Sequence, residues 1–256
     1  MFDAVAADIR TALGGVDDWG LSGQKDTQYH HDVAANDAAI DRLLDAGVGV
    51  LSEETGLHEP DREVVVVIDP VDGSTNASHG LPWYATSLCA VRDGFAEAAL
   101  VMNLATGTTY RAQPGVGASR DGIPLSGQRS RLDMQRGPSE VQRGPSEVQS
   151  LSDAIIACSG LPLSEQRWRQ FRVMGACALD MCAVADGSFD AYFDCGDAHG
   201  VWDYLGALVV CREAGLEAVD AFGRDLVILD PEARRAPIVA ATPELLGEVV
   251  ALRQSF

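Results

Sequence analysis

The sequence is short of positive charge. Its 256 residues contain 19 Lys and Arg against 38 Asp and Glu, which gives a formal net charge of −19. Nucleic acids and anionic membranes both favour basic surfaces, so we expect neither as a partner. An enzyme with an anionic substrate would need cations to mask some of these acids, and a cluster of divalent ions would make such a pocket attractive.

Long apolar runs and paired cysteine motifs are also missing. No run approaches the 18 or so apolar residues of a membrane span. The start, Met1 to Arg10, lacks a basic segment followed by an apolar one, so we expect no signal peptide and a cytoplasmic protein. The six cysteines form no C-x-x-C pair, and most have apolar neighbours. This pattern predicts reduced, buried thiols rather than a disulfide framework or a zinc site.

The stretch E-V-V-V-V-I-D-P-V-D-G-S-T-N, from Glu63 to Asn76, is where we expect the chemistry to start. Val64 to Ile68 has the composition of a buried strand. The strand ends at Asp69, and the turn that follows brings Asp72 back beside it. Two carboxylates and a carbonyl therefore converge, and hard divalent cations bind such oxygen clusters.

The residues after this turn suggest a phosphate site. Gly73, Ser74 and Thr75 can open a short helix, whose free N–H groups favour a phosphate. Asp-Pro and Asp-Gly are, however, common in plain turns. The choice between a turn and a site depends on the rest of the chain.

Two further acidic motifs accompany the turn. Glu53 and Glu54 follow an apolar segment upstream, and Trp202-Asp203 begins a helical pattern far downstream. In this order, with D-P-V-D-G-S-T-N from Asp69 to Asn76, the motifs resemble the inositol monophosphatase family of magnesium-dependent, lithium-sensitive phosphatases. The resemblance covers most of the chain.

The resemblance implies two Mg²⁺ ions and inhibition by lithium. It assigns the first ion to Glu53, Asp69 and the carbonyl of Val71. It assigns the second ion to Asp69, Asp72 and Asp203, so that Asp69 bridges the two. Asp203 at a helix start is also compatible with a plain capping role.

The resemblance also implies a hydrolytic mechanism. The Ser74 hydroxyl orients the attacking water, relayed through Glu53 or Asp37, while the amides of Gly73 and Ser74 hold the phosphate oxygens. Asp37, in the helical pattern Asp37-Ala38-Ala39-Ile40-Asp41, either holds a third, looser Mg²⁺ through water or is an exposed helix acid. Of the adjacent histidines His30 and His31, we expect a surface or capping role rather than a shared metal site.

The leaving group is expected to contact Gly175, Ala176 and the loop from Asp194 to Val201, with Asp203 beside it. Ala176 stands where the family usually has a hydroxyl. Gly175 to Cys177 and the loop contain no Lys or Arg to hold a second phosphate. The sequence therefore predicts a phosphate monoester as substrate, inositol 1-phosphate first.

Three alternatives remain open. Histidinol phosphate would suit Asp194 and Asp197 through its amine, and a nucleotide 3′,5′-bisphosphate is hydrolysed elsewhere in the family. A regulatory protein that keeps the fold without catalysis is the non-enzyme alternative. A calcium-binding module is disfavoured, because D-P-V-D-G lacks the alternate-residue spacing of a calcium loop.

The order of expected elements predicts a mixed α+β and α/β fold, and the resemblance implies a five-layered αβαβα sandwich and a homodimer. We place a domain boundary at the tandem repeat of Q-R-G-P-S-E-V, Gln135 to Val148, which is expected to be a surface loop. Residues 1–148 would form an α+β domain with an antiparallel sheet and the metal-binding turn. Residues 149–256 would form an α/β domain with Asp203 and the leaving-group pocket. The elements expected there are strands at 153–158, 189–193, 226–229 and 238–241 and helices at 163–171, 176–185, 203–214 and 243–253.

Overall fold

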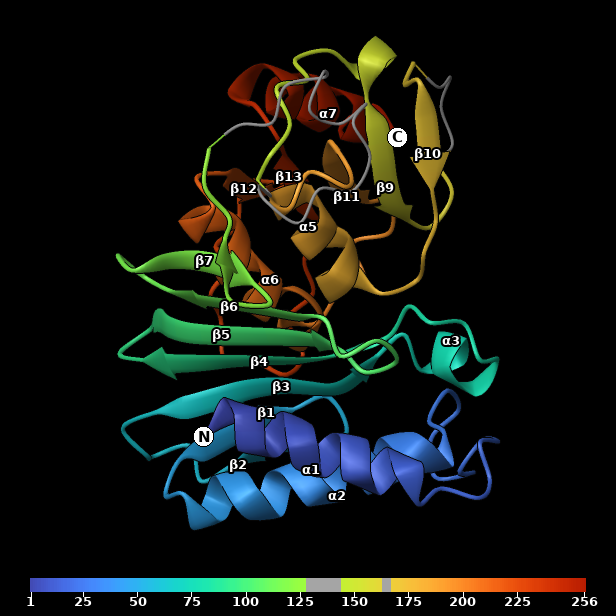
Figure 1. Cartoon of the computed structure of the whole chain (residues 1–256), viewed down its shortest axis with the longest axis vertical. Helices are drawn as coiled ribbons and strands as arrows, with labels where there is room; N and C mark the ends of the chain where they lie inside the picture. Colours follow the sequence, from blue (N-terminus) through green and yellow to red (C-terminus); the bar gives the residue numbers. More distant parts are fainter. Residues whose placement is uncertain (128–143, 163–166) are drawn as a thin grey trace.

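Two β-sheets and three layers of helices stack on one another in the computed structural model, which describes residues 1–127, 144–162 and 167–256 (Figure 1). The layers run helix, sheet, helix, sheet, helix from the bottom of Figure 1 to the top. The predicted αβαβα sandwich is therefore confirmed.

The first helical layer consists of α1 (Phe2–Gly14) and α2 (His30–Asp45), which pack on each other. In α1 the buried residues Val5, Ala6, Ile9 and Leu13 recur at the spacing of one helix face. This face and the buried face of α2 form a hydrophobic core with the first sheet.

The first sheet has eight strands in the order β2-β1-β3-β4-β5-β6-β7-β8. β1 and β3 are parallel and the other neighbours are antiparallel, as the turn signals of this half predicted. All eight residues of β3 are buried, because α2 covers one face of the strand and α6 the other. The strands are β1 (Gly49–Ser52), β2 (Gly56–His58), β3 (Val65–Asp72), β4 (Ala85–Arg92), β5 (Phe95–Asn103), β6 (Thr109–Gln113), β7 (Gly117–Arg120) and β8 (Ile123–Pro124).

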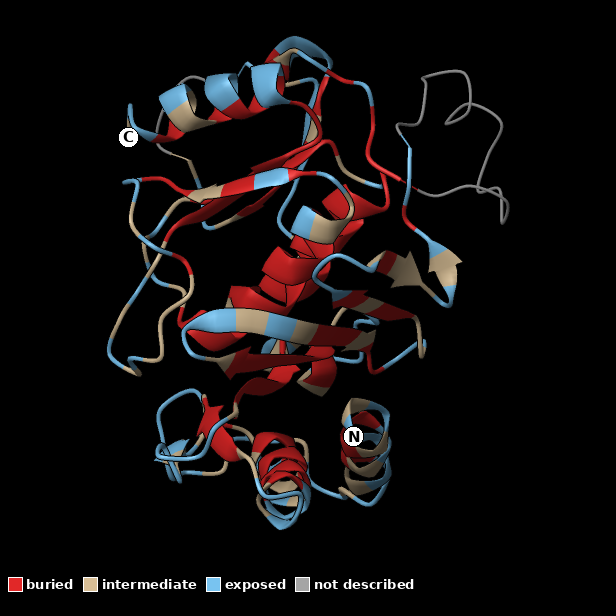
Figure 2. Cartoon of the chain, turned by 90° about the vertical axis from the view of Figure 1, so that its left-hand side faces the viewer, coloured by how far each residue is buried: buried red, intermediate tan, exposed pale blue. Residues whose placement is uncertain are grey.

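The middle layer, α5 (Cys177–Ala185) and α6 (Val201–Glu213), lies between the two sheets. Every residue of α5 is buried, and most of α6 is buried too. Figure 2 shows these central helices in red, whereas the helix nearest the C-terminus has a pale blue outer face. A helix that is apolar all round is typical of such a central position.

The second sheet has five strands in the order β10-β9-β11-β13-β12. Its parallel strands β10, β9 and β11 end at the same edge, so the segments that follow them gather there. The elements are β9 (Ile155–Ser159), β10 (Gln170–Arg172), β11 (Ala191–Asp194), β12 (Glu217–Asp220), β13 (Pro237–Ala240) and the covering helix α7 (Pro243–Arg253). A one-turn helix, α3 (Ser74–Ser78), and a 3₁₀ turn, η1 (Leu151–Asp153), complete the described elements.

Two predicted elements of the second half are wrong. The helix expected over Leu163–Phe171 lies partly outside the described residues, and where it is described Gln170 begins strand β10 beside β9. The strand expected over Leu226–Leu229 is an irregular segment whose side chains pack on the core, and the strand at this edge is β12. Both segments are short, and the periodicity of a short apolar or mixed segment does not distinguish a helix, a strand and an irregular segment.

The tandem repeat is only partly described, from Gly144 onward. The end of its second copy is packed rather than exposed: Ser146 is 0% and Val148 7% exposed, and Val148 belongs to the core under α7. A surface loop is therefore the wrong interpretation for this part. The domain boundary at residue 148 stays a prediction.

Two further findings concern the whole of the described chain. All six cysteines are free, and five of them are buried. Among the described residues, no helix is long and apolar enough to cross a membrane.

Candidate active site

The end of β3 turns two acids toward the space between the sheets. Pairing between β3 and β4 is interrupted between Asp69 and Asp72, as in a β-bulge, which redirects side chains. The Val71 N–H donates to Asp69 Oδ1 at 2.9 Å, which fixes the first carboxylate. The Val71 carbonyl accepts from the Ser74 hydroxyl at 2.8 Å.

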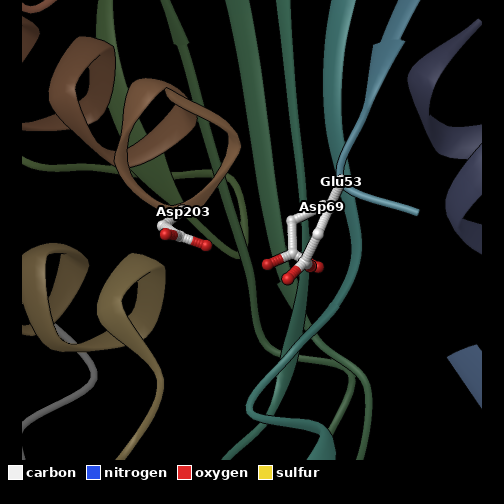
Figure 3. A group of neighbouring side chains, drawn as sticks. All are labelled: Glu53, Asp69 and Asp203. Atoms are coloured by element: carbon white, nitrogen blue, oxygen red, sulfur yellow. The ribbon is translucent and has the colours of Figure 1, made fainter. Parts of the chain in front are cut away.

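Three acids from distant parts of the chain meet at this point. Glu53 follows β1, Asp69 lies in β3, and Asp203 lies in the first turn of α6. Each offers a carboxylate oxygen, and the three oxygens lie within 4.8 Å of one another. Figure 3 shows Glu53 and Asp69 side by side and Asp203 reaching toward them from the opposite helix.

Electrostatics in the cluster favour a bound cation. The pKa values of Glu53 and Asp69 are raised well above their usual range, first by burial and then by the neighbouring acids. Within the described chain, no Lys or Arg forms an ion pair with Glu53, Asp69 or Asp203. Close carboxylates that no described Lys or Arg neutralises fit a hard divalent ion such as Mg²⁺, which prefers oxygen ligands.

Asp72 lies beside this cluster and is held by the start of α5. Its carboxylate accepts from the N–H groups of Cys177 at 3.2 Å and Ala178 at 2.7 Å. Burial, and then the charge of Asp203, raise the pKa of Asp72 to about 7, although these N–H groups act in the opposite direction. Asp72 is not one of the three acids within 4.8 Å of one another.

The predicted phosphate-binding residues meet the predicted leaving-group residues. Gly73 has a φ of 89°, and a Cβ there would lie 3.1 Å from the Gly175 carbonyl and 3.2 Å from the Ala176 Cβ. Ser74 is half-buried, whereas Thr75 is exposed, with its hydroxyl 3.2 Å from that of Tyr29. The structure therefore brings residues 73–75 to residues 175 and 176, about a hundred positions apart in the sequence.

The helical acid beside Ser74 is Asp32. Burial raises the pKa of Asp32 to about 6, while the Tyr29 N–H and the Ser74 hydroxyl lower it. Its Oδ2 accepts from the Tyr29 N–H at 2.8 Å. Asp37 lies on the exposed side of the same helix and is not one of the clustered acids.

His30 and His31 point apart, as expected, but only one of them is on the surface. His31 is fully buried and stacks on the ring of Tyr29, with centroids 5.2 Å apart. The surface or capping role expected for His31 is therefore wrong. Asp32 and Asn36 share this buried face of α2. Their spacing of four residues, the same as that of the buried apolar residues of this helix, could have predicted from the sequence that they are buried.

The acids of the leaving-group loop are already bound within the protein. Asp194 is buried and accepts from the N–H groups of Gly196 at 3.1 Å and Ala198 at 3.3 Å. Asp197 forms an ion pair with Arg224, which also binds Asp220. Arg224 could not be placed here from the sequence, because only the fold brings it to this loop.

Two cationic or ionisable groups at the site escaped sequence reasoning. Lys25, the only lysine in the chain, donates to the Glu54 carbonyl at 2.7 Å and lies 3.6 Å from the Glu54 carboxylate. His199 lies 3.0 Å from Asp203 through its Nδ1. His199 precedes the first residue of α6, so the helical i,i+4 rule could not have identified this contact from the sequence.

Comparison with known proteins identifies the family of the chain. The sequence pattern of the inositol monophosphatase family matches residues 4–255. A fructose-1,6-bisphosphatase/inositol-1-monophosphatase of Thermococcus kodakarensis is 30% identical over 89% of this chain and 82% of its own length. An inositol-1-monophosphatase of Mycobacterium tuberculosis is 32% identical over 84% of this chain and 74% of its own.

The fold is shared with solved structures as well. A Pyrococcus horikoshii protein, described as having similarities to inositol-1 monophosphatase, superposes with a TM-score of 0.80. The two are 22% identical, and the match covers 98% of this chain and 94% of the other.

Proposed function

Because the chain belongs to the inositol monophosphatase family, a family of metal-dependent phosphatases, we propose that it hydrolyses a small phosphate monoester with Mg²⁺, and that inositol 1-phosphate is its preferred substrate. The observation that carries the proposal is that carboxylate oxygens of Glu53, Asp69 and Asp203 lie within 4.8 Å of one another. The cluster lies next to the glycine-led start of α3, where a phosphate would bind.

We assign two metal positions to these donors and to Asp72 beside them. The first would use Glu53, Asp69 and the Val71 carbonyl, and the second Asp69, Asp72 and Asp203. When bound, the ions would activate a water and stabilise the negative charge that develops on the leaving oxygen. Inhibition by lithium, and a third, looser ion near Asp37, stay predictions from the family resemblance.

The protein's own groups would orient the water and accept its proton. Ser74 lies between the Val71 carbonyl, which accepts from its hydroxyl at 2.8 Å, and Asp32. Ser74 has one hydroxyl proton, so in the relay this proton would turn from the Val71 carbonyl to the Asp32 carboxylate while Ser74 takes a proton from the attacking water. We therefore assign Asp32 the relay role predicted for Asp37 or Glu53. The N–H groups of Gly73 and Ser74 would hold the phosphate oxygens.

The substrate preference depends on the charge around the leaving group. Asp194 and Asp197 are bound within the protein, so they support an amine-containing substrate such as histidinol phosphate less than the sequence suggested. Arg224 is neutralised by Asp197 and Asp220 and is poorly placed to hold a second phosphate. These contacts support a monoester with an uncharged polyol group.

Arg172 is the specific reason to test a bisphosphate. It ends β10, three residues before Gly175, and within the described residues its side chain donates to two neutral oxygens, those of Gln170 at 2.9 Å and Phe171 at 2.8 Å. A cationic side chain therefore lies close in sequence to the leaving-group residues. The archaeal relative, whose name includes fructose-1,6-bisphosphatase, makes the same comparison worthwhile.

The test is a comparison of kcat/KM for inositol 1-phosphate, histidinol phosphate, fructose 1,6-bisphosphate and adenosine 3′,5′-bisphosphate, with Mg²⁺ and with EDTA. We expect hydrolysis only with Mg²⁺ and the highest value for inositol 1-phosphate. A higher value for a bisphosphate would overturn the monoester assignment. An absence of turnover on every substrate would favour the regulatory alternative.

We also propose a homodimer in the cytoplasm that binds neither nucleic acid nor membranes. The net charge of −19 and the six free cysteines support this environment. Size-exclusion chromatography with light scattering tests the oligomeric state.

A further inference from the structure

His199 connects the acid cluster to the second sheet through its side chain. Its Nδ1 lies 3.0 Å from Asp203 Oδ2, and its Nε2 lies 2.9 Å from the hydroxyl of Tyr192. The Tyr192 hydroxyl in turn lies 2.8 Å from that of Ser159, at the end of β9. Four polar side chains thus form one chain of contacts from α6 to β9.

These four side chains have little freedom to move. Tyr192 is fully buried in β11, and each nitrogen of the His199 ring has a hydrogen-bond partner. The backbone of His199 is fixed as well, because its carbonyl accepts from the Arg235 N–H at 2.9 Å and its own N–H donates back at 3.2 Å. A ring held at both ends cannot turn away from Asp203 without breaking several buried contacts.

These contacts determine which oxygen of Asp203 is available. Oδ2 lies 3.0 Å from His199 Nδ1 and accepts from the Gly200 N–H at 2.8 Å. No residue in the described ranges donates to Oδ1, so this oxygen can face the cluster that Asp203 forms with Glu53 and Asp69. A carboxylate with one oxygen held by two such contacts has less rotational freedom to lose when its other oxygen binds an ion, which favours ion binding.

We propose that His199 is a positioning residue for Asp203, and that Tyr192 acts by holding the His199 ring. The inference rests on the proposed role of Asp203 as a metal ligand. It predicts that the His199 Nδ1 donor tunes affinity for the ion without touching the substrate.

The test measures Mn²⁺ binding by calorimetry on the full chain, so that turnover is not needed. His199→Ala is expected to weaken binding roughly 10- to 100-fold, the usual effect of removing a group that orients a metal ligand. His199→Asn, whose amide can place an N–H near the position of Nδ1, should recover part of the loss. His58→Asn, at the outer strand β2, is the matched control and should bind as the wild type does.

A double-mutant cycle tests the role of Tyr192. Tyr192→Phe should weaken Mn²⁺ binding in the wild type but have no further effect beside His199→Ala, because its influence passes through the ring. Tyr204→Phe is the control for loss of a buried hydroxyl, since the Tyr204 hydroxyl donates to the Leu226 carbonyl at 2.9 Å, and no hydrogen bond among the described residues joins it to His199.

Unchanged Mn²⁺ affinity in a folded His199→Ala protein would overturn the proposal, as would an Asn variant no better than the Ala variant. Circular dichroism and melting curves identify variants that fail to fold, and Tyr192→Phe then provides the milder change. If no phosphate ester is hydrolysed but Mn²⁺ binding falls as expected, the proposed function fails while the positioning role stands.

Discussion

The Asp72 carboxylate accepts a hydrogen bond from the Ala178 N–H at 2.7 Å, across 106 residues of sequence. The turn after β3 and the start of α5 are thereby joined at the site. The same approach leaves no room beside Gly73, where a Cβ would lie 3.1 Å from two carbonyl oxygens. The turn that follows β3 is therefore packed tightly against the start of the central helix α5.

Gly73→Ala should destabilise the protein more than Gly80→Ala. Both glycines have positive φ, 89° and 70°, so both substitutions carry a left-handed cost of about 1–2 kcal/mol. Only Gly73 is crowded, since nothing lies within 4 Å of a Cβ at Gly80, and crowding adds roughly 1–3 kcal/mol. Melting curves check the difference, and equal losses for the two variants would show that this packing is loose.

Asp69→Asn and Asp203→Asn should each lower Mg²⁺-dependent turnover by at least about 10²-fold, because each removes a charge that would hold an ion in the site. Without metal, Asp69→Asn should not lower the stability, since burial and like charges already raise the pKa of Asp69.

Mg²⁺ provides the second measurement on these variants. At about 100 times its Kd it should stabilise the wild type by about 2.7 kcal/mol, or roughly 5–10 °C in Tm, and each variant by much less. Asp61→Asn, an exposed acid away from the cluster, is the control. A variant that keeps the full thermal shift would remove its residue from the metal site.

Ser74→Ala should lower kcat more than it raises KM. The hydroxyl would act on the attacking water rather than on substrate binding, and the residue is only half-buried, so folding should be little affected. Steady-state kinetics with inositol 1-phosphate measure both constants. Unchanged kcat would remove Ser74 from the mechanism.

The pH profile of kcat/KM should show an acid limb near pH 6. Burial raises the pKa of Asp32 to about 6, and only its carboxylate form can accept a proton from Ser74, so activity should rise through this range and level off above it. The contribution of Asp32 to the free energy of unfolding changes with pH in the opposite direction. The folded state holds a proton that the unfolded state releases near pH 4, so this contribution is present at low pH and is lost as pH rises through 6.

Asp32→Asn should remove this limb and Asp37→Asn should keep it. The comparison decides which acid of α2 serves the site. A pH profile that changes only in Asp37→Asn would instead support Asp37 as the relay residue, as the sequence first suggested.

Ser146→Ala should destabilise the protein by about 2 kcal/mol, because the buried Ser146 hydroxyl donates to the Asp190 carboxylate at 2.6 Å. Deletion of Gln142–Val148 should nevertheless change Tm little. The two copies are identical, so the remaining Q-R-G-P-S-E-V again precedes Gln149 and can make the same contacts. A large fall in Tm after deletion would show that the loop needs its full length.

Local sequence determined the strand that carries Asp69, the turn through Gly73 and the order of the three acidic motifs. These features depend on β-branched composition, on a proline, and on a glycine that tolerates positive φ, all of which are properties of neighbouring residues. The helices of the central layer were likewise predictable, because most of their residues are apolar.

Only the tertiary structure decided which polar groups meet across the layers. Asp32 rather than Asp37 lies beside Ser74, because the rotation of α2 on the sheet is set by packing and not by motif spacing. Arg224 neutralises Asp197 across 27 residues, through a contact that depends on how the second sheet is folded. Hydrogen bonds and ion pairs between distant segments leave no periodic signal in a sequence, so their partners appear only when the chain is folded.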